Sequence, residues 1–435
     1  MSNNFLNKPY LPILLIALFS VSFASYSFVQ TNKELPVDYV NSNFENASPL
    51  FWENEPDGSA LIHILYDHER STPNRASNHV LFQVHAKSGS DVVLKIQFFD
   101  EIWNGKRVPS QSLVKNYHVS ADGKVWKIIP AELFEKGHKV KIHMDSDKIY
   151  VAGMEPYRIS DLEKLKNEIR NNPLVEIQTI GKTVEGRDLE IIRVGKKDAP
   201  FGVFIRARAH PWEAGGNWVV QGLIRNLLKS KNKETRYLDK YCVYIMPMTN
   251  KDGVAHGYTR FNCLGMDLNR GMNRPADPRL SPENLAFETW MKAMTSKGMK
   301  PNIVMDLHND RNGKLDFGNP AKVNSDEYSS EKTTASLQDS YTVMAKGTDI
   351  EKFQSNAKRF EVLMYKHTWY TWTENNVRKD AGNPGSYKGI RYDVDLSCLL
   401  ELNQTWIEGM KKVPSGKDWE LLGENLCDVF FYYFE

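Results

Sequence analysis

Two histidines and two glutamates of this chain stand within or just after apolar, strand-like runs. His210 and Glu213 follow GVFIRARA, His308 ends NIVMDLH, and Glu401 lies within SCLLELN. In an open α/β sheet, ligands and chemistry collect beyond the carboxyl ends of the strands. We therefore expect these four side chains to share one pocket, although they are far apart in the sequence.

These residue types are the parts of a hydrolytic zinc site. A catalytic zinc takes three protein ligands, often two His and one Glu, and keeps a fourth position for water. The spacing in HPWE puts His210 and Glu213 on one side of a strand-to-helix turn, and His308 is the natural third ligand. His-x-x-Glu alone carries a serious risk of false positives, and a His at a strand end is often a satisfied buried group. The surrounding segments therefore carry the assignment.

Three further polar residues, Arg260, Asn269 and Arg270, follow the apolar run YCVYIMPM. A fixed guanidinium stabilises an oxyanion where charge develops, and the planar fork of Arg matches a carboxylate in a bidentate geometry. Taken singly, both arginines would be ordinary surface cations. Glu401 is harder to dismiss, because a carboxylate inside an apolar run is costly to bury unless it is paired or near a cation.

Five segments follow one another in the order found in zinc metallocarboxypeptidases. They are GKTVEGRDLEIIRVG, ARAHPWEAGG, MPMTNKDGVAHGYTRFNCLGMDLNRG, MDLHND and CLLELN. The chain resembles this family over roughly Glu163 to Trp406, and most closely the branch that includes the cytosolic carboxypeptidases. DLNR downstream of NKDG is far more specific than HPWE.

The resemblance implies a role for each candidate residue. The implied set is His210, Glu213 and His308 as ligands of one zinc ion, Glu401 as general base, Arg260 as the oxyanion-stabilising residue, and Asn269 with Arg270 as the carboxylate clamp. The implied reaction is hydrolysis by a zinc-activated water whose proton the general base accepts. The implied partner is a peptide with a free carboxyl terminus, from which the last residue is removed.

Two departures from the family pattern concern the substrate pocket. Trp212 precedes the metal-binding Glu, where some members have Arg and the cytosolic branch usually has Gly, so the pocket wall is bulkier here. The substrate-facing tyrosine of digestive members has two candidate counterparts, Tyr387 in NPGSYKG and Tyr392 in GIRYDVD. No spacing selects one of them, and tyrosine is also a common half-buried packing residue.

The region from Lys33 to Pro156 has the pattern of an antiparallel β-sandwich. Short apolar runs such as HVLFQVHA and DVVLKIQFF alternate with turn clusters, which is the spacing of such a fold. Asp122 and Gly123 predict a hairpin with a type I′ turn. The region resembles the β-sandwich that precedes the catalytic domain in the cytosolic carboxypeptidase branch. Its role is open between walling the cleft, binding sugar and packing alone.

Helices and strands alternate over residues 159–435. This order predicts an α/β domain with a mixed, mostly parallel sheet flanked by helices, the carboxypeptidase-like fold that the resemblance implies. GGNWVVQGLIRNLLKS carries one apolar helical stripe directly after HPWE, and Ser281 before Pro282 marks another helix start. The polar stretch from Lys322 to Asp349 is interpreted either as a lid or as a solvated surface insertion.

Residues 1–24 have the pattern of a secretion signal. Lys8 precedes the apolar run YLPILLIALFSVSFA, and Ser22 and Ala24 are the small residues of a cleavage site. The run is shorter than the ~20 residues of a membrane span. We therefore expect a periplasmic or secreted protein without stable membrane association, with an uncleaved anchor as the alternative.

Length and composition fit two globular domains. The chain has 435 residues, 41% of them hydrophobic. The net charge of +2, without basic runs or recognition motifs, predicts no nucleic-acid partner. The four cysteines lack any C-x-x-C pairing. They can form up to two disulfides in an oxidising compartment or act as small buried hydrophobes.

Three functions fit these residues. The first is a zinc carboxypeptidase acting on a peptide, including a cell-wall peptide. The second is an amidase or deacylase that uses the same zinc machinery on a small acylated substrate and tolerates loss of the Arg270 clamp. The third is a catalytically silent binding protein, in which Glu401 would have no chemical task. No motif marks the residue removed or the oligomeric state.

Overall fold

The computed structural model describes most of the chain beyond its first 35 residues. The described residues are 36–108, 116–135, 137–229, 235–270, 275–310, 313–317, 350–370, 377–378 and 392–435. The predicted signal segment, Tyr387 and the polar stretch from Lys322 to Asp349 lie outside them. Pro36–Glu435 form one compact unit. Among the described helices, none combines the length and apolarity that crossing a bilayer demands.

The amino-terminal part of this unit consists of short strands in three sheets. The strands are β1 (Tyr39–Asn41), β2 (Leu50–Asn54), β3 (Ala60–Ile64), β4 (Asp67–His68), β5 (Arg75–Ala76), β6 (Leu81–His85), β7 (Asp91–Phe98), β8 (Glu101–Trp103), β9 (Lys106–Val108), β10 (Asn116–Ser120), β11 (Lys127–Pro130), β12 (Glu132–Phe134), β13 (Gly137–His143) and β14 (Lys148–Ala152). Two five-stranded sheets have the orders β1-β6-β14-β10-β11 and β12-β13-β7-β3-β2, and a small four-stranded sheet has the order β4-β5-β8-β9. Every second residue of β7 is buried, because one face of the strand packs on the core between the sheets.

The predicted antiparallel sandwich is confirmed with two corrections. β3 and β7 pair in parallel, whereas the other described pairings in this part are antiparallel. The hairpin near Asp122 joins β10 and β11, but the type I′ turn is wrong, since only Gly123 has a positive φ, of 68°. Oδ1 of Asp122 accepts backbone N–H bonds from Lys124 and Val125. The connection is therefore a longer loop organised by that side chain.

The carboxyl-terminal part contains a mixed sheet of eight described strands, in the order β15-β16-β18-β17-β19-β22-β20-β21. They are β15 (Val175–Lys182), β16 (Asp188–Val194), β17 (Phe201–Ala207), β18 (Tyr241–Met246), β19 (Ile303–Asp310), β20 (Lys314–Phe317), β21 (Val377–Arg378) and β22 (Leu396–Asn403). The central strands β18, β17, β19 and β22 are parallel neighbours, and antiparallel pairings flank them. The predicted mixed, mostly parallel sheet is confirmed.

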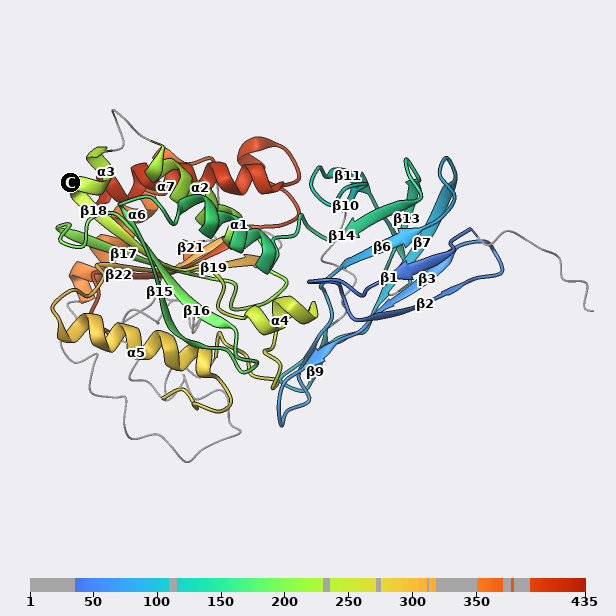
Figure 1. Cartoon of the computed structure of the whole chain (residues 1–435), viewed down its shortest axis with the longest axis horizontal. Helices are drawn as coiled ribbons and strands as arrows, with labels where there is room; N and C mark the ends of the chain where they lie inside the picture. Colours follow the sequence, from blue (N-terminus) through green and yellow to red (C-terminus); the bar gives the residue numbers. More distant parts are fainter. Residues whose placement is uncertain are drawn as a thin grey trace, which may run out of the picture. The chain divides into compact units, whose positions relative to one another are not determined.

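Helices cover both faces of this sheet (Figure 1). They are α1 (Ile159–Ile169), α2 (Gly215–Leu228), α3 (Thr235–Lys240), α4 (Lys251–His256), α5 (Pro282–Ser296), α6 (Ile350–His367), the 3₁₀ helix η7 (Glu408–Met410) and α7 (Gly416–Tyr433). Val203 and Ile205 of β17 belong to the core beneath α2 and α7, whereas Phe204 packs against Phe287 of α5. Successive strand residues face opposite sides, so one strand serves both cores. α2 follows HPWE and α5 starts after Ser281, as predicted.

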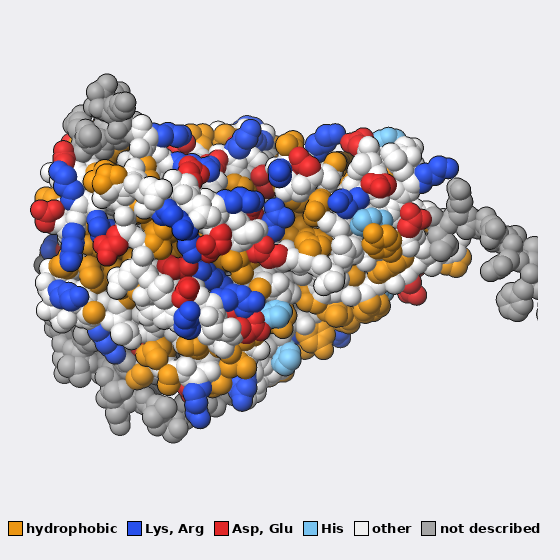
Figure 2. Space-filling view, viewed as in Figure 1, with side chains coloured by type: hydrophobic (Ala, Val, Ile, Leu, Met, Phe, Trp, Pro, Cys, Tyr) orange, Lys and Arg blue, Asp and Glu red, His pale blue; other side chains and the backbone are white. Residues whose placement is uncertain are grey.

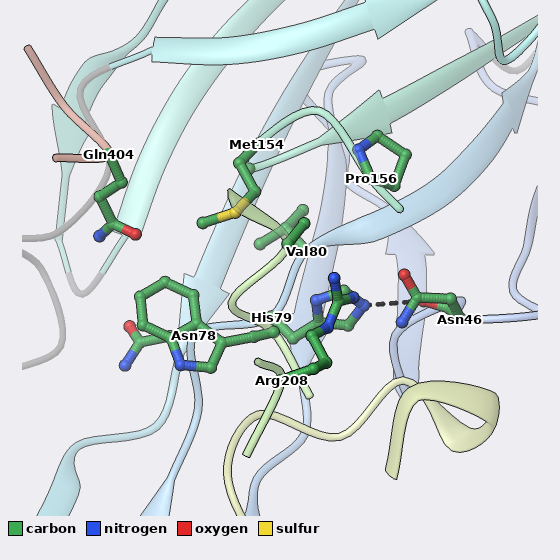
Figure 3. A pocket seen from close by; sticks show the side chains of 11 residues that line it. Asn46, Asn78, His79, Val80, Met154, Pro156, Arg208 and Gln404 are labelled. Atoms are coloured by element: carbon green, nitrogen blue, oxygen red, sulfur yellow. Dashed lines mark hydrogen bonds between the residues drawn. The ribbon is translucent and has the colours of Figure 1, made fainter. Parts of the chain in front are cut away.

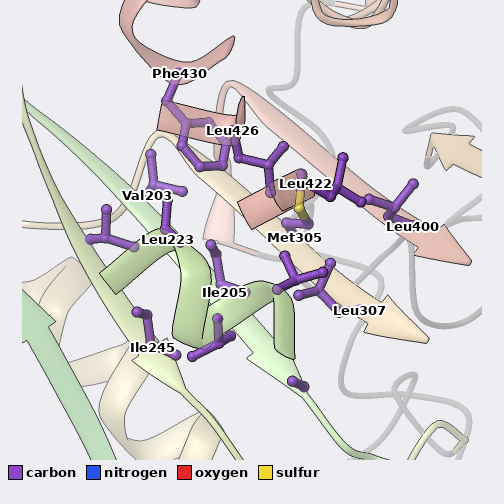
Figure 4. Packing of buried hydrophobic residues seen from close by; sticks show 14 of the residues in the cluster. Val203, Ile205, Leu223, Ile245, Met305, Leu307, Leu400, Leu422, Leu426 and Phe430 are labelled. Atoms are coloured by element: carbon purple, nitrogen blue, oxygen red, sulfur yellow. The ribbon is translucent and has the colours of Figure 1, made fainter. Parts of the chain in front are cut away.

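The contact between α2 and α7 is close because each helix places a glycine at the crossing. A Cβ atom at Gly222 would lie 2.0 Å from the carbonyl oxygen of Glu420, and one at Gly423 would lie 2.0 Å from that of Val219. Around this crossing, leucines and Phe430 pack onto the strands beneath (Figure 4). The start of α2 also lies close to the sheet, since a Cβ atom at Gly216 would lie 3.0 Å from Cβ of Leu307 in β19.

The state of the cysteines and the distribution of surface charge both fit the sequence composition. All four cysteines are free thiols, and Cys242, Cys398 and Cys427 are buried, so they act as small hydrophobic residues here. Basic and acidic side chains are interspersed over the face shown in Figure 2. That face carries no large patch of a single sign of charge.

Candidate active site

His210, Glu213 and His308 come together as the sequence predicts. The three residues are buried, and their ligand atoms lie within 4.8 Å of one another. Nδ1 of His210 lies 2.7 Å from Oε1 of Glu213, and Nδ1 of His308 lies 2.7 Å from Oε2 of the same carboxylate. The two Nδ1 atoms are 3.2 Å apart. Both imidazoles therefore direct the same ring nitrogen at one carboxylate.

Two carboxylates behind the imidazoles set their tautomers. Nε2 of His210 donates to Oδ1 of Asp267 over 3.2 Å, and Nε2 of His308 donates to Oδ2 of Asp306 over 3.1 Å. With the proton on Nε2, each Nδ1 presents a lone pair toward Glu213. Histidines that bind metals almost always donate their other ring N–H in this way.

With these tautomers, lone pairs face one another at 2.7 Å, an arrangement that a bound cation would stabilise. Although burial opposes ionisation, His210 and His308 lower the pKa of Glu213. Although burial disfavours the charge, Glu213 and Asp306 raise the pKa of His308. When a metal ion binds, it displaces the proton that a histidine with a raised pKa would otherwise hold. Two imidazole nitrogens and one carboxylate at this spacing fit zinc in a catalytic geometry.

The HPWE turn is fixed by Arg208, whose backbone has a positive φ of 62°. Its guanidinium is fully buried. Nε donates to the carbonyl oxygen of Pro211 over 2.6 Å, and Nη1 donates to Oδ1 of Asn217 in α2 over 3.2 Å. A left-handed Arg backbone persists only where its surroundings determine it. Arg208 therefore ties the end of β17 to the start of α2, which orients His210 and Glu213.

Strand register places Glu401 beside the metal ligands. β19 and β22 are parallel, and His308 pairs with Glu401 across them. Glu401 keeps only part of its surface exposed. Burial raises its pKa, although His308 favours the charged form. A carboxylate held in this way next to a metal position is suited to accept and return a proton.

Asp267 also connects the predicted arginines to the metal ligands. Its Oδ2 accepts the Nε–H of Arg260 over 2.8 Å, and its Oδ1 accepts the backbone N–H of Asn269 over 2.8 Å. Although burial opposes ionisation, Arg260, Arg270 and His210 hold the pKa of Asp267 well below its usual range. The structure thus gathers Arg260, Asn269 and Arg270, three of the five predicted substrate-binding residues, around the carboxylate that binds His210.

Trp103, at the end of β8, lies against both arginines. Cζ of Arg260 is 4.7 Å from the centre of its ring system, and Cζ of Arg270 is 5.3 Å from it. Nη1 of Arg270 also donates to the carbonyl oxygen of Asn269 over 3.1 Å. Because β8 belongs to the small sheet of the amino-terminal part, the site contains residues from both parts of the chain.

Of the two tyrosine candidates for contacting the substrate, only Tyr392 lies within the described residues. Tyr392 is buried, and its ring centre lies 6.3 Å from that of Phe287 in the core beneath α5. This position favours a packing role for Tyr392. Tyr387 lies outside the described residues. Trp212 is half-buried and packs against the main core.

A small cavity lies beside the HPWE turn (Figure 3). Asn46 and His79 line it from the amino-terminal part, and Arg208, Trp212 and Gln404 line it from the carboxyl-terminal part. Its volume is about 20 Å³, which is room for little more than one water-sized molecule. It is therefore too small to receive a peptide side chain.

Sequence reasoning missed the residues that hold the ligands in place. Asp306 precedes His308 by two positions, so a strand puts both side chains on one face, and Asp267 begins the DLNR motif. Those two positions were readable signals. No sequence signal pointed to Trp103.

Comparisons with known proteins identify a family match and similar folds. The family model described as zinc carboxypeptidase, peptidase family M14, matches residues 161–374. Cytosolic carboxypeptidase 6 of Caenorhabditis elegans is 28% identical over 178 residues, which cover 39% of this chain and 37% of that protein. An uncharacterised protein of Zymomonas mobilis is 27% identical over 193 residues, which cover 44% and 49%. The chain thus spans about half or less of the length of these curated relatives.

Solved structures share the fold of the chain. A metallo-carboxypeptidase of Pseudomonas aeruginosa, in complex with (2-guanidinoethylmercapto)succinic acid, is similar with a TM-score of 0.73 and 19% identity, covering 91% of this chain and 100% of the other. A metallo-carboxypeptidase of Burkholderia cenocepacia has a TM-score of 0.70 and 19% identity, covering 91% and 98%. The family match shows that residues 161–374 are similar to the zinc carboxypeptidases of peptidase family M14, and the solved structures show that the chain shares the fold of metallo-carboxypeptidases.

Proposed function

We propose that this protein is a zinc-dependent carboxypeptidase that removes the carboxyl-terminal residue of a peptide. The observation that carries the proposal is the carboxylate of Asp267, which binds His210 of the metal-ligand group, the side chain of Arg260 and the backbone of Asn269. One carboxylate thus connects the metal ligands with the oxyanion-stabilising residue and with the carboxylate clamp.

Glu401 is the residue that transfers the proton. His210, Glu213 and His308 would hold the zinc ion, which when bound lowers the pKa of water to about 7 and polarises the scissile carbonyl. Glu401 accepts a proton from the attacking water and returns it to the leaving amine. Its partial burial supports this exchange, because a desolvated carboxylate binds a proton more readily than one in water.

The two arginines meet the negative charges of the substrate. Arg260, oriented by Asp267, stabilises the oxyanion of the tetrahedral intermediate. Arg270 grips the free terminal carboxylate through its planar fork, with Asn269 beside it. A silent binding protein would have no use for Glu401, and an amidase would have none for Arg270.

The metal assignment predicts the effect of His308→Ala. Bound zinc should fall from about one ion per chain to less than about a tenth of that, because two protein ligands hold the ion too weakly. Metal analysis of the purified protein measures this. His256→Ala, at an exposed histidine paired with Glu185, should keep its zinc. Undiminished zinc in His308→Ala would refute the ligand assignment.

The base assignment predicts that Glu401→Gln is inactive but still binds metal. Gln keeps the size and hydrogen bonding of Glu yet cannot accept the proton, so kcat should fall at least ~10²-fold. Steady-state kinetics with metal analysis of the same sample test this. Glu408→Gln, at an exposed residue paired with Lys411, is the control and should retain kcat. Turnover that survives in Glu401→Gln with zinc bound would make Glu401 structural.

The clamp predicts that a peptide acid is cleaved at least ~10²-fold better, by kcat/KM, than its carboxyl-terminal amide, because the amide offers the guanidinium of Arg270 no carboxylate. Arg270→Ala should erase most of this preference by impairing the acid alone. Arg279→Ala, whose side chain is 86% exposed, should preserve it. Equal rates for acid and amide with the wild-type protein would favour the amidase alternative.

We also propose that residues 1–24 are removed during export and that the protein acts in the periplasm or outside the cell. The support is the apolar run behind Lys8 with small residues at its end. Mass spectrometry of protein from a bacterial host should find Ser25 at the amino terminus. Leu14→Arg, which interrupts the apolar run, should block processing. An intact amino terminus on the wild-type protein would contradict the proposal.

A further inference from the structure

The segment that carries Arg260 is held by the sandwich. Asp67 lies in β4 of the small sheet. Its Oδ1 accepts the backbone N–H of Thr259 over 2.9 Å, and its Oδ2 accepts those of Arg260 and Phe261 over 2.8 and 2.7 Å. One carboxylate thus binds three consecutive N–H groups, which fixes the backbone from which the Arg260 side chain extends.

Two glycines fit the flanks of this segment against the sandwich backbone. Gly257 and Gly265 have positive φ values of 66° and 76°. A Cβ atom at Gly257 would lie 1.9 Å from the carbonyl oxygen of Ala47, and one at Gly265 would lie 2.8 Å from the backbone nitrogen of Arg70. That nitrogen donates to the carbonyl oxygen of Gly265 over 2.8 Å. The sandwich therefore determines the path of the chain on both sides of Arg260.

The guanidinium itself meets a second element of the same small sheet. Trp103 ends β8, and its indole lies 4.7 Å from Cζ of Arg260 and 5.3 Å from Cζ of Arg270. The face of an aromatic ring attracts a guanidinium. A single ring thus contacts both cations.

We propose that the sandwich is part of the catalytic apparatus, with Asp67 and Trp103 as positioning residues for Arg260 and Arg270. The inference rests on the proposed function, because those two arginines are the groups being positioned. Stabilisation of an oxyanion depends on donors that are in place before the reaction, and a misplacement of about 1 Å can cost ~10²-fold in rate. Positioning the active site is a role beyond the three that the sequence left open for the sandwich, and these contacts favour it.

The first test is Asp67→Asn, which leaves one carbonyl oxygen for three N–H groups. For a peptide acid, kcat should fall at least ~10-fold while KM changes less than about twofold, because Arg260 acts on the transition state. Amide hydrogen exchange over residues 257–265, followed by mass spectrometry, should accelerate at least ~10-fold. Asp57→Asn, at an exposed sandwich carboxylate paired with Lys95, is the control and should change neither quantity.

The second test uses Trp103→Leu, with Trp103→Phe as the conservative variant. The Leu variant should lose ~10-fold or more in kcat/KM for the acid and in the preference for acid over amide, with zinc retained. The Phe variant should recover most of both, since it keeps an aromatic face. Trp126→Leu removes a sandwich tryptophan that packs on Tyr150, with ring centres 6.4 Å apart, and should leave both unchanged.

The outcomes separate this inference from the function on which it rests. Wild-type kcat and wild-type exchange in Asp67→Asn would overturn the role of Asp67. An equal loss in Trp103→Leu and Trp126→Leu, without recovery in Trp103→Phe, would leave the sandwich a packing module and overturn the role of Trp103. If the wild-type protein cleaves no peptide acid, the proposed function fails, while hydrogen exchange still reports whether Asp67 holds the segment.

Discussion

The rest of the site depends on the hydrogen bonds that the buried carboxylate of Asp267 accepts. It accepts hydrogen bonds from Nε2 of His210, Nε of Arg260 and the backbone of Asn269. A buried carboxylate is costly when it is alone, and here three donors, one of them Arg260, together with the nearby Arg270 offset that cost. The imidazole of His210 and the guanidinium of Arg260 are consequently held by the same side chain, so neither can move independently.

Strand register supplies the remaining geometry. The parallel pairing of β19 with β22 sets His308 beside Glu401, and that of β17 with β19 sets Arg206 beside Asp306. Arg206 is fully buried; its Nη1 lies 3.5 Å from Asp306, and its Nη2 donates to the carbonyl oxygen of Leu268 over 3.0 Å. Because side chains alternate with a period of two, a slip of one residue would turn these groups to the opposite face of the sheet. The hydrophobic core that fixes the strand register therefore also keeps these side chains on one face of the sheet.

The sandwich has its own hydrophobic core, but several of its polar groups form hydrogen bonds with the carboxyl-terminal part. Oγ1 of Thr259 accepts the backbone N–H groups of Asn78 and His79 over 3.1 and 3.2 Å, and Nδ2 of Asn46 donates to the carbonyl oxygen of Val254 over 3.0 Å. Leaving such buried groups unpaired costs about 1–3 kcal/mol each. This penalty favours one docked arrangement, which agrees with the single compact unit formed by Pro36–Glu435.

Local patterns predicted that His210, Glu213 and His308 share one site, and the structure gathers them into one buried group; the same patterns predicted the mixed sheet and the sandwich. Apolar runs that end in His308 or contain Glu401 have the period of strands, and strand ends meet at one edge of a sheet. The hairpin at Gly123 was predicted for the same local reason, although its turn type depended on hydrogen bonds that no dipeptide specifies. The partnership of Asp67 and Trp103 with Arg260 was decided only by the tertiary structure. Asp67 and Arg260 are 193 positions apart, and their contact exists because the amino-terminal and carboxyl-terminal parts meet within one compact unit. Such a contact leaves no periodicity or spacing in the sequence.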